Sequence, residues 1–264
     1  MVSPDVVESA ASRLARAAGT GQPCPPVRDL LADDAMAAYE VQRRLVAARV
    51  GAGARIVGRK IGLTAPAVQR QLGVDRPDFG FLLDDMALPD DGVASISRLL
   101  QPRIEAEVAI VLDRDIIDPE ASANSVRSAI GYLLAALEIV DSRIADWNIS
   151  YTDTVADNAS SGLYVLGTER GMLAQVEPRE VVMSLQVCGV EASTGRGSDC
   201  LGDPLEALAW LARTAVEFGH PLRAGQVVLS GALGPMVAVG AGDVVHAQIS
   251  GLGGVSVRFE EEQA

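Results

Sequence analysis

The spacing of apolar and polar positions predicts helices in about the first 52 residues. From Met1 to Ala18, charged residues interrupt the apolar ones, which is typical of a retained amphipathic helix and not of a signal peptide. From Asp33 to Gly51, apolar residues recur every three or four positions behind an aspartate that suits a helix cap. A helical N-terminal portion is therefore expected.

Strand patterns follow this helical portion. From Arg55 to Leu63, charged or small residues alternate with branched ones, and Lys60 lies near the end of the pattern. A short helix is expected from Val68 to Leu72. From Ile104 to Leu112, strict alternation gives way to a continuous apolar run, as in a strand that enters a core.

In the second half of the chain, periodicity and capping residues predict more helices, followed by a series of strands. Helical periodicity is predicted from Ser125 to Val140. A helix over 203–219 is marked by an aspartate cap, a first-turn proline, a capping-box glutamate and a final glycine. Over 226–259, short valine-rich strands alternate with glycine-rich turns typical of hairpins.

Helices and strands are partly segregated along the chain, without regular β-α alternation. This arrangement favours an α+β fold with twisted mixed sheets over a doubly wound sheet. A chain of 264 residues is long enough for one domain, expected over 1–264 with a helical portion at about 1–52. The glycine-rich stretches match neither dinucleotide-binding nor P-loop motifs, so a nucleotide cofactor is not indicated.

Composition narrows the possible partners and the compartment. The chain has 35 acidic and 22 basic residues and a net charge of -13, which disfavours nucleic acid and anionic membranes as partners. Its apolar stretches are too short to cross a bilayer, so the protein is expected to be soluble. Three cysteines without C-x-x-C spacing fit a reducing cytoplasm. Two histidines leave little basis for a histidine-rich metal site or a Ser-His-Asp triad.

Three glutamates are candidate metal ligands. Glu105 and Glu107 lie two apart on a predicted strand, so their side chains share one face about 7 Å apart at their bases. Glu138 is surrounded by apolar residues and needs a cation, an arginine such as Arg143, or a raised pKa to offset its burial. Three carboxylates suit Mg²⁺ or Mn²⁺, which prefer oxygen ligands. The alternative for Glu105 and Glu107 is a solvent-facing strip on an edge strand.

Lys60 and Asp78 are candidate acid-base groups. A lysine at the end of a largely apolar strand is expected to be desolvated, which lowers its pKa towards the working range. Exposure to solvent is the usual state of a lysine and the alternative here. Asp78 is followed by Phe79 and Gly80 and suits a turn or a helix cap as well as a catalytic acid. The stretch 158–162 is by itself a polar loop.

Five motifs together resemble the 2-hydroxypenta-2,4-dienoate (2-oxopent-4-enoate) hydratases of aromatic and steroid catabolism, within the fumarylacetoacetate hydrolase superfamily. They span most of the chain in the order found in that family. They are Gly58-Arg59-Lys60-Ile61-Gly62-Leu63-Thr64, Gln71-Leu72-Gly73-Val74 with Pro77-Asp78-Phe79-Gly80, Gln101-Pro102-Arg103-Ile104-Glu105-Ala106-Glu107, Leu137-Glu138-Ile139-Val140-Asp141-Ser142-Arg143, and Ala156-Asp157-Asn158-Ala159-Ser160-Ser161-Gly162.

The resemblance implies a set of roles. Metal ligation is implied for Glu105, Glu107 and Glu138, and proton transfer in the substrate site for Lys60 and Asp78. Substrate hydrogen bonding is implied for Ser160 or Ser161. The family fold is a mixed β-sheet roll flanked by helices and assembled into homo-oligomers. The implied reaction adds water at C4 of a small unsaturated 2-oxo acid, giving 4-hydroxy-2-oxopentanoate.

Two alternatives stay open. The sister decarboxylase acting on 4-oxalocrotonate would use the same metal and dienolate but release carbon dioxide, although the motifs around Lys60 and Asp78 read more like the hydratase. A non-catalytic partner subunit of a hydratase-decarboxylase complex is the other, and the presence of all the proposed ligands and Lys60 speaks against it. The carbon-carbon hydrolases of the superfamily use an early His-Glu pair, and no histidine precedes His220.

Overall fold

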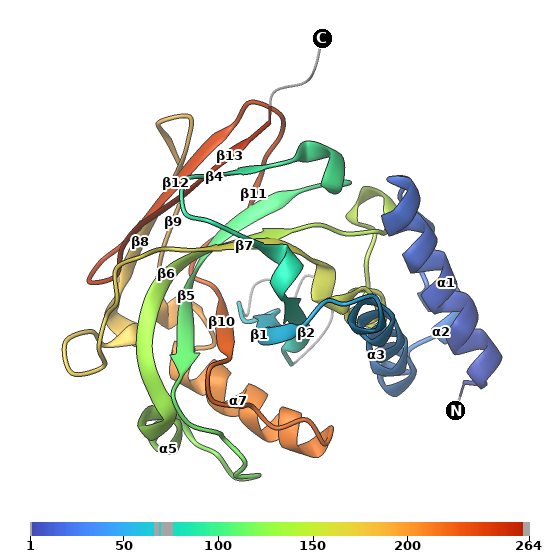
Figure 1. The fold of residues 1–264 in the computed structure, drawn as a ribbon, viewed down its shortest axis with the longest axis horizontal. Coiled ribbons are helices and arrows are strands. Elements are labelled where there is room, and N and C mark those ends of the chain that lie inside the picture. The colour runs from blue at the N-terminus through green and yellow to red at the C-terminus, as the bar shows by residue number, and fades with distance from the viewer. Residues whose placement is uncertain (1, 66–68, 70–75, 261–264) are drawn as a thin grey trace.

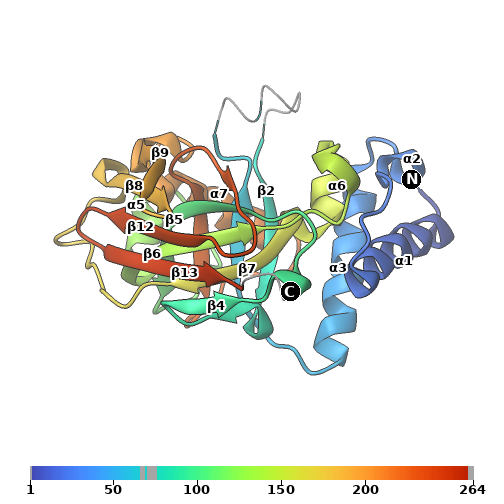
Figure 2. The ribbon, with the colours of Figure 1, turned by 90° about the horizontal axis from the view of Figure 1, so that it is seen from above.

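The first helices form a group at one end of the molecule. The computed structural model describes residues 2–65, 69 and 76–260. Helices α1 (Pro4–Thr20), α2 (Arg28–Leu31) and α3 (Ala35–Gly51) lie beside one another (Figure 1; Figure 2). The Asp34 side chain caps α3 by accepting a hydrogen bond from the Ala37 N–H at 3.0 Å. Both predicted N-terminal helices are confirmed.

A large curled sheet forms the centre of the molecule. Its strands follow the order β2-β1-β10-β5-β6-β7-β3, and β11 also pairs with β5. The pairs β1–β10 and β3–β7 are parallel, and the other pairs are antiparallel. The strands are β1 (Ile56–Gly62), β2 (Asp78–Leu83), β3 (Ala87–Leu88), β5 (Arg103–Leu112), β6 (Ile130–Val140), β7 (Ser161–Leu166), β10 (Val227–Ala232) and β11 (Val237–Ala238).

A second, five-stranded sheet packs against the long strands of the first, where β13 and β12 contact β6 (Figure 1). Its order is β4-β13-β12-β8-β9, and only the β4–β13 pair among these described strands is parallel. The expected α+β fold with mixed sheets is confirmed. The strands are β4 (Gly92–Ala94), β8 (Val182–Val187), β9 (Val190–Arg196), β12 (Val244–Ile249) and β13 (Gly253–Phe259).

One of the remaining helices packs on the large sheet, and another packs mainly against α3. Helix α7 (Pro204–Glu217) packs on β10, and the Asp203 carboxylate caps its start by accepting from the Leu205 N–H at 2.8 Å, as the sequence predicts. Two short helices, α5 (Ala123–Val126) and α6 (Tyr151–Ala156), precede turns of the chain. Short 3-10 turns complete the elements, at 84–86, 96–98, 127–129, 145–147, 158–160, 178–180 and 197–199.

The predicted helix over 125–140 is wrong. Helical structure covers only α5 and a 3-10 turn to Ala129, and Ile130–Val140 is the strand β6 between β5 and β7. Residues Leu133 to Val140 are all buried. A strand covered on both faces is apolar at every position and so carries no period-2 signal, which makes it resemble a buried helix.

The valine-rich strands over 226–259 are confirmed, but only one predicted hairpin forms there among the described residues. Strands β12 and β13 pair through the turn 250–252. Strands β10 and β11 each pair with β5 instead of with each other, and the glycines before β12 lead the chain into the second sheet. The predicted helix from Val68 to Leu72 lies outside the described residues, except for Gln69.

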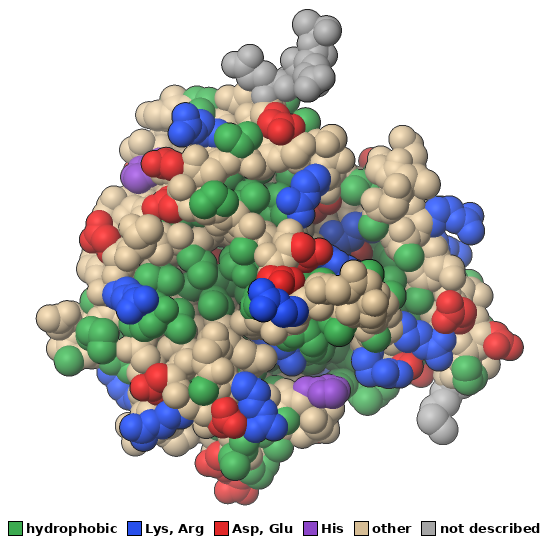
Figure 3. Space-filling model, viewed as in Figure 1, with side chains coloured by type: hydrophobic (Ala, Val, Ile, Leu, Met, Phe, Trp, Pro, Cys, Tyr) green, Lys and Arg blue, Asp and Glu red, His purple; other side chains and the backbone are tan. Residues whose placement is uncertain are grey.

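The core extends through the middle of the large sheet. All of β5 after Arg103 and all of β6 from Leu133 onward are buried, so the central strands of this sheet are covered on both faces. The outer surface shown in Figure 3 carries acidic and basic side chains interspersed with hydrophobic ones. Among the described residues, no helix combines the length and apolar character needed to cross a bilayer.

Candidate metal centre and active site

Three glutamates converge because β5 and β6 are neighbours in the sheet. Glu105 lies directly opposite Glu138 in the antiparallel register, and Glu107 is two residues further along β5 on the same face. One carboxylate oxygen from each residue lies within 4.8 Å of the other two. Strand pairing thus brings Glu138 next to Glu105 and Glu107, although it lies 33 positions after Glu105 in the sequence.

The three carboxylates are buried and incompletely hydrogen-bonded. Glu107 is fully buried, and Glu138 and Glu105 are 1% and 8% exposed. A bulge in β10 lets the Gly231 N–H donate to Glu107 Oε2 at 2.6 Å. Among the described residues, Glu107 Oε1 and Glu138 Oε2 have no hydrogen-bond donor. Buried acceptors without partners are costly, so this cluster calls for a positive ion.

Burial raises the pKa of all three carboxyls, and repulsion from Glu138 adds to the increase for Glu105 and Glu107. Burial first and Glu138 second raise the pKa of Glu105 to about 7. The same two causes hold the pKa of Glu107 well above its ordinary value, and burial raises that of Glu138 against the opposing effect of Lys60. Without a cation the cluster therefore retains protons near neutral pH, and a bound ion would take their place.

The donor set fits a hard divalent cation. Mg²⁺ takes oxygen ligands at about 2.0–2.1 Å in octahedral geometry, which places trans oxygens about 4.2 Å apart. The spacing of the three glutamate oxygens, within 4.8 Å, allows one ion to contact all of them. Three carboxylates leave further positions for water or substrate oxygens, as a catalytic ion requires.

Lys60 lies beside this cluster, on β1. Its Nζ is 3.1 Å from Glu138 Oε1 and donates to the Ala159 carbonyl at 3.0 Å. The expected burial is confirmed, with 3% of the residue exposed, but the expected lowering of its pKa is wrong. Burial alone would lower the pKa, yet Glu138 and the carboxylates around it outweigh burial and raise it. Lys60, and not Arg143, is the cation beside Glu138.

Asp78 opens β2 next to Lys60. Its Oδ2 accepts a hydrogen bond from the Thr154 hydroxyl at 3.2 Å, while Oδ1 has no donor among the described residues. Burial raises the pKa of Asp78 against the opposing effect of Lys60. A Cβ at Gly62 would lie 2.1 Å from Asp78 Oδ1, so the glycine in the Lys60 motif makes room for this carboxyl.

The two predicted substrate-binding serines lie in different surroundings. Ser160 lines the cavity next to the metal centre, and its Oγ is 3.4 Å from the Thr154 hydroxyl. Ser161 does not line this cavity, and its buried Oγ has no hydrogen-bond partner among the described residues. Three successive non-glycine residues, 158–160, have φ of 52–55°. Such left-handed backbone needs support from its surroundings.

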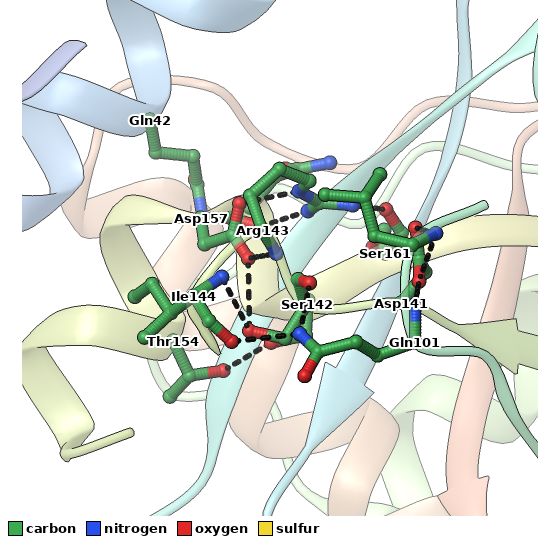
Figure 4. Close-up of polar contacts among 12 residues, drawn as sticks. Gln42, Gln101, Asp141, Ser142, Arg143, Ile144, Thr154, Asp157 and Ser161 are labelled. Carbon is green, nitrogen blue, oxygen red and sulfur yellow. Dashed lines mark hydrogen bonds and ion pairs between the residues drawn. The ribbon is translucent and has the colours of Figure 1, made fainter. Parts of the chain in front are cut away.

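An arginine-aspartate network provides that support (Figure 4). Arg143 Nε donates to Asp157 Oδ1 at 2.5 Å, and the two Nη groups donate to the carbonyls of Ser161 and Asp157 at 2.8 and 2.6 Å. Burial raises the pKa of Asp157 to about 6, against the opposing effect of Arg143. Arg143 thus holds Asp157 and Ser161, the two residues that flank the segment with the Ala159 carbonyl and Ser160.

A cavity of about 360 Å³ adjoins these groups. Lys60, Asp78 and Glu105 line one part of it, together with Thr154 and Ser160. The remaining wall is largely apolar, with Arg103 as its cation. The Arg103 guanidinium stacks on the Trp147 ring, 4.6 Å from the centroid. The apolar wall includes Leu63, Val140, Trp147, Ile149 and Met236.

Some of these residues were not predicted as site residues. Thr154 and Gly231 contribute a hydroxyl and a backbone N–H, and neither has a chemical signature of its own in sequence. Arg103 stands within the quoted motif that carries Glu105 and Glu107, and this position was a signal that could have identified it. Arg143 and Asp157 stand in the motifs quoted above, but their pairing depends on a loop connection that spacing does not reveal.

Comparisons with known proteins agree on one group. The profile of the family described as fumarylacetoacetate (FAA) hydrolase C-terminal matches residues 65–260. The chain is 49% identical to a 2-keto-4-pentenoate hydratase of Paraburkholderia xenovorans (strain LB400), over 99% of this chain and 98% of the relative. It is 48% identical to one of Burkholderia vietnamiensis (strain G4 / LMG 22486), over 99% and 100%. The solved 4-oxalocrotonate decarboxylase from Pseudomonas putida G7, complexed with magnesium and adipate, superposes with a TM-score of 0.94 at 32% identity, covering 98% of this chain and 99% of that one.

Proposed function

The chain belongs to the fumarylacetoacetate hydrolase family, and from this premise we propose that it is a metal-dependent 2-keto-4-pentenoate hydratase. This hydro-lyase adds water to 2-keto-4-pentenoate, the keto form of 2-hydroxypenta-2,4-dienoate, and gives 4-hydroxy-2-oxopentanoate. The observation that carries the proposal is near-full-length identity of 48–49% to hydratases in a chain with three converging buried carboxylates.

Glu105, Glu107 and Glu138 would hold the divalent ion, with Mg²⁺ or Mn²⁺ as the ion proposed. When bound, such an ion would polarise the 2-oxo group of the substrate and favour its enol form. The glutamates suit this role because burial leaves two of their oxygens without any other described partner. The Gly231 N–H fixes the orientation of Glu107 by holding its other oxygen.

Lys60 and Asp78 would move the protons. The reaction places one proton on C5 as the dienol becomes a 2-oxo-3-enoate, and one on C3 as water adds at C4. Burial raises the pKa of Asp78, which favours the protonated carboxyl, and the surrounding carboxylates raise the pKa of Lys60, which favours the ammonium. Both groups line the cavity, within reach of a small acid bound beside the glutamates.

Ser160 is the serine that we propose to contact the substrate, because it lines the cavity. The Thr154 hydroxyl lies between Ser160 and Asp78, 3.4 Å from the Ser160 Oγ and 3.2 Å from Asp78 Oδ2. Thr154 would thus position both groups. We also propose that the protein is located in the cytoplasm, in line with its three free thiols. A homo-oligomer is proposed by analogy with the family.

An absorbance assay tests the proposed reaction. Purified protein with Mg²⁺ is expected to remove the ultraviolet absorbance of 2-hydroxypenta-2,4-dienoate and to form 4-hydroxy-2-oxopentanoate, identified by mass spectrometry. Absence of this product at saturating Mg²⁺ and substrate would contradict the proposal.

A second candidate is 4-oxalocrotonate decarboxylation, favoured by the close superposition on that decarboxylase. Identity to this enzyme is 32%, against 49% to a hydratase, so hydration is the better supported activity. Carbon dioxide release from 4-oxalocrotonate, without hydration of the dienoate, would favour the decarboxylase. Inertness towards both substrates would favour a structural partner subunit.

A further inference from the structure

A second polar group of β1, Arg59, is buried away from the metal centre. Arg59 and Lys60 are consecutive on a strand, so their side chains point to opposite faces of the sheet. Arg59 lies opposite Phe81 on β2, and its guanidinium stacks on the Phe81 ring at 3.9 Å from the centroid. Only 4% of the residue is exposed.

Within the part of the chain that the structure describes, no acidic side chain pairs with this buried guanidinium. Among the described residues, its side-chain hydrogen bond goes to the Gly58 carbonyl, at 3.0 Å, and it forms no ion pair. Burial lowers the pKa of Arg59 to about 10, without an opposing contribution from a carboxylate. A buried charge is ordinarily paired, and an arginine has five N–H donors to satisfy.

The guanidinium faces a cavity of about 130 Å³ with aromatic walls. Tyr39 stacks on Phe79 at 4.8 Å, and Phe218 contacts both rings at 4.7 and 5.7 Å. An engineered apolar cavity of about 150 Å³ holds a benzene ring, and this cavity is slightly smaller. The rim of the cavity includes Met36, which is 66% exposed and leaves an apolar approach.

Glu40 at the rim does not supply the missing charge. Its two oxygens accept hydrogen bonds from Arg43 at 2.7 Å each, and one of them also accepts from Arg44 at 3.2 Å. As far as the structure describes the chain, the cavity therefore combines the guanidinium of Arg59, which has no ion-pair partner, with walls that are mostly aromatic and also include Gln42 and His220.

We propose that this cavity is a binding site for a small monocarboxylic acid with a flat apolar body. The carboxylate would pair with the Arg59 guanidinium, which suits the planar bidentate geometry of that pair, and the body would lie among Tyr39, Phe79 and Phe218. The site is on the opposite face of β1 from the glutamate cluster, so it is separate from the proposed hydratase site and does not rest on it.

Benzoate is the probe that tests the site. In metal-free protein, at constant ionic strength, benzoate is expected to raise Tm in a saturable way, and neutral benzyl alcohol is expected to raise it at least fivefold less. Equal effects of the two compounds would overturn the proposal, because the charge would then play no part.

Variants locate the binding. Arg59→Met is expected to weaken benzoate binding at least tenfold, and Arg59→Lys to weaken it less. Ala215→Leu, which fills the cavity while keeping the guanidinium, is expected to weaken it as well and serves if Arg59→Met does not fold. Arg103→Met, in the wall of the other cavity, is expected to bind benzoate as the wild type does.

Two results would overturn the proposal. One is that Arg103→Met loses at least as much benzoate binding as Arg59→Met, which would place the acid in the active-site cavity. The other is a change in subunit number of Arg59→Met, measured by light scattering, with no benzoate effect in the wild type. That result would show that an acidic group of a second copy occupies the cavity.

Discussion

At the scale of residues, the site brings opposite charges together on buried side chains. Lys60 offsets part of the negative charge of the glutamates and lies 3.1 Å from Glu138 Oε1. Two glutamate oxygens nevertheless lack a described donor. An ion bound there would satisfy them, and the proposed proton-transfer groups, Lys60 and Asp78, would act beside it.

Glu107→Gln tests the ligand role. The amide keeps the volume of the side chain but is a poor ligand for a hard cation, so turnover is expected to fall by roughly 100-fold or more. Circular dichroism should show an intact fold. Glu206→Gln, an exposed change on α7, is the matched control and should keep wild-type activity. Wild-type turnover of Glu107→Gln at ordinary Mg²⁺ would count against the ligand role.

Asp78→Asn separates proton transfer from metal binding. The amide cannot supply a proton but keeps the hydrogen-bonding distance to Thr154, so kcat should drop by roughly 100-fold or more while Mg²⁺ affinity changes little. Steady-state kinetics with a parallel metal titration measure both quantities. A fall in metal affinity that accounts for the whole loss would contradict a proton-transfer role.

At the scale of elements, the sequence predicts those helices and strands that carry a local signal, such as alternating apolar positions or capping residues. The strand from Ile104 to Leu112 and the capped helix starting at Asp203 were both identified, because alternation and capping residues are local signals. Ile130–Val140 was not, because a strand buried on both faces has no alternation to detect. The Glu138 position was thus predicted on the wrong element, although its burial was foreseen.

The site was partly predictable for the same reason. Local spacing put Glu105 and Glu107 on one face, but pairing with Glu138 depends on the β5–β6 register, which no local pattern encodes. The direction of the Lys60 pKa shift was missed because strand apolarity indicates burial and not the carboxylates that other strands bring near.

Arg143→Met tests the network that fastens the 157–161 segment. Removing the guanidinium leaves Asp157, 2% exposed, as a buried unpaired carboxyl, which is expected to cost about 3–5 kcal/mol of stability. Thermal denaturation should show a fall in Tm on the order of 10 °C. Arg223→Met, which removes an exposed pair with Asp115, is the control and should change Tm far less. Equal effects of the two changes would contradict a structural role for the network.

At the scale of the whole molecule, buried carboxyls govern how stability depends on pH. The pKa values of Asp157 and Glu105 are raised to about 6 and about 7, and that of Glu107 is raised well above its ordinary value. A carboxyl with a raised folded-state pKa contributes stability that is present at low pH and lost as pH rises through that value. Carboxyls with lowered pKa values, such as Asp84, act mainly below their unfolded-state values near pH 4.

Metal-free protein is therefore expected to lose stability between about pH 5 and pH 8, with a fall in Tm on the order of 5 °C. Mg²⁺ binds the deprotonated carboxylates, so its stabilising effect should grow over the same interval. Scanning calorimetry with and without Mg²⁺ measures both trends. A metal-free Tm that rises over this interval, or a Mg²⁺ effect independent of pH, would contradict the account.

The central claim is that three glutamates from two neighbouring strands bind one divalent ion, and a Mn²⁺ titration followed by electron paramagnetic resonance tests it most directly. In the wild type, the signal of free Mn²⁺ should stay absent until one ion per chain has been added. In Glu107→Gln, this signal should appear from the first addition. Free Mn²⁺ throughout the wild-type titration, or one tightly bound ion in the variant as well, would contradict the claim.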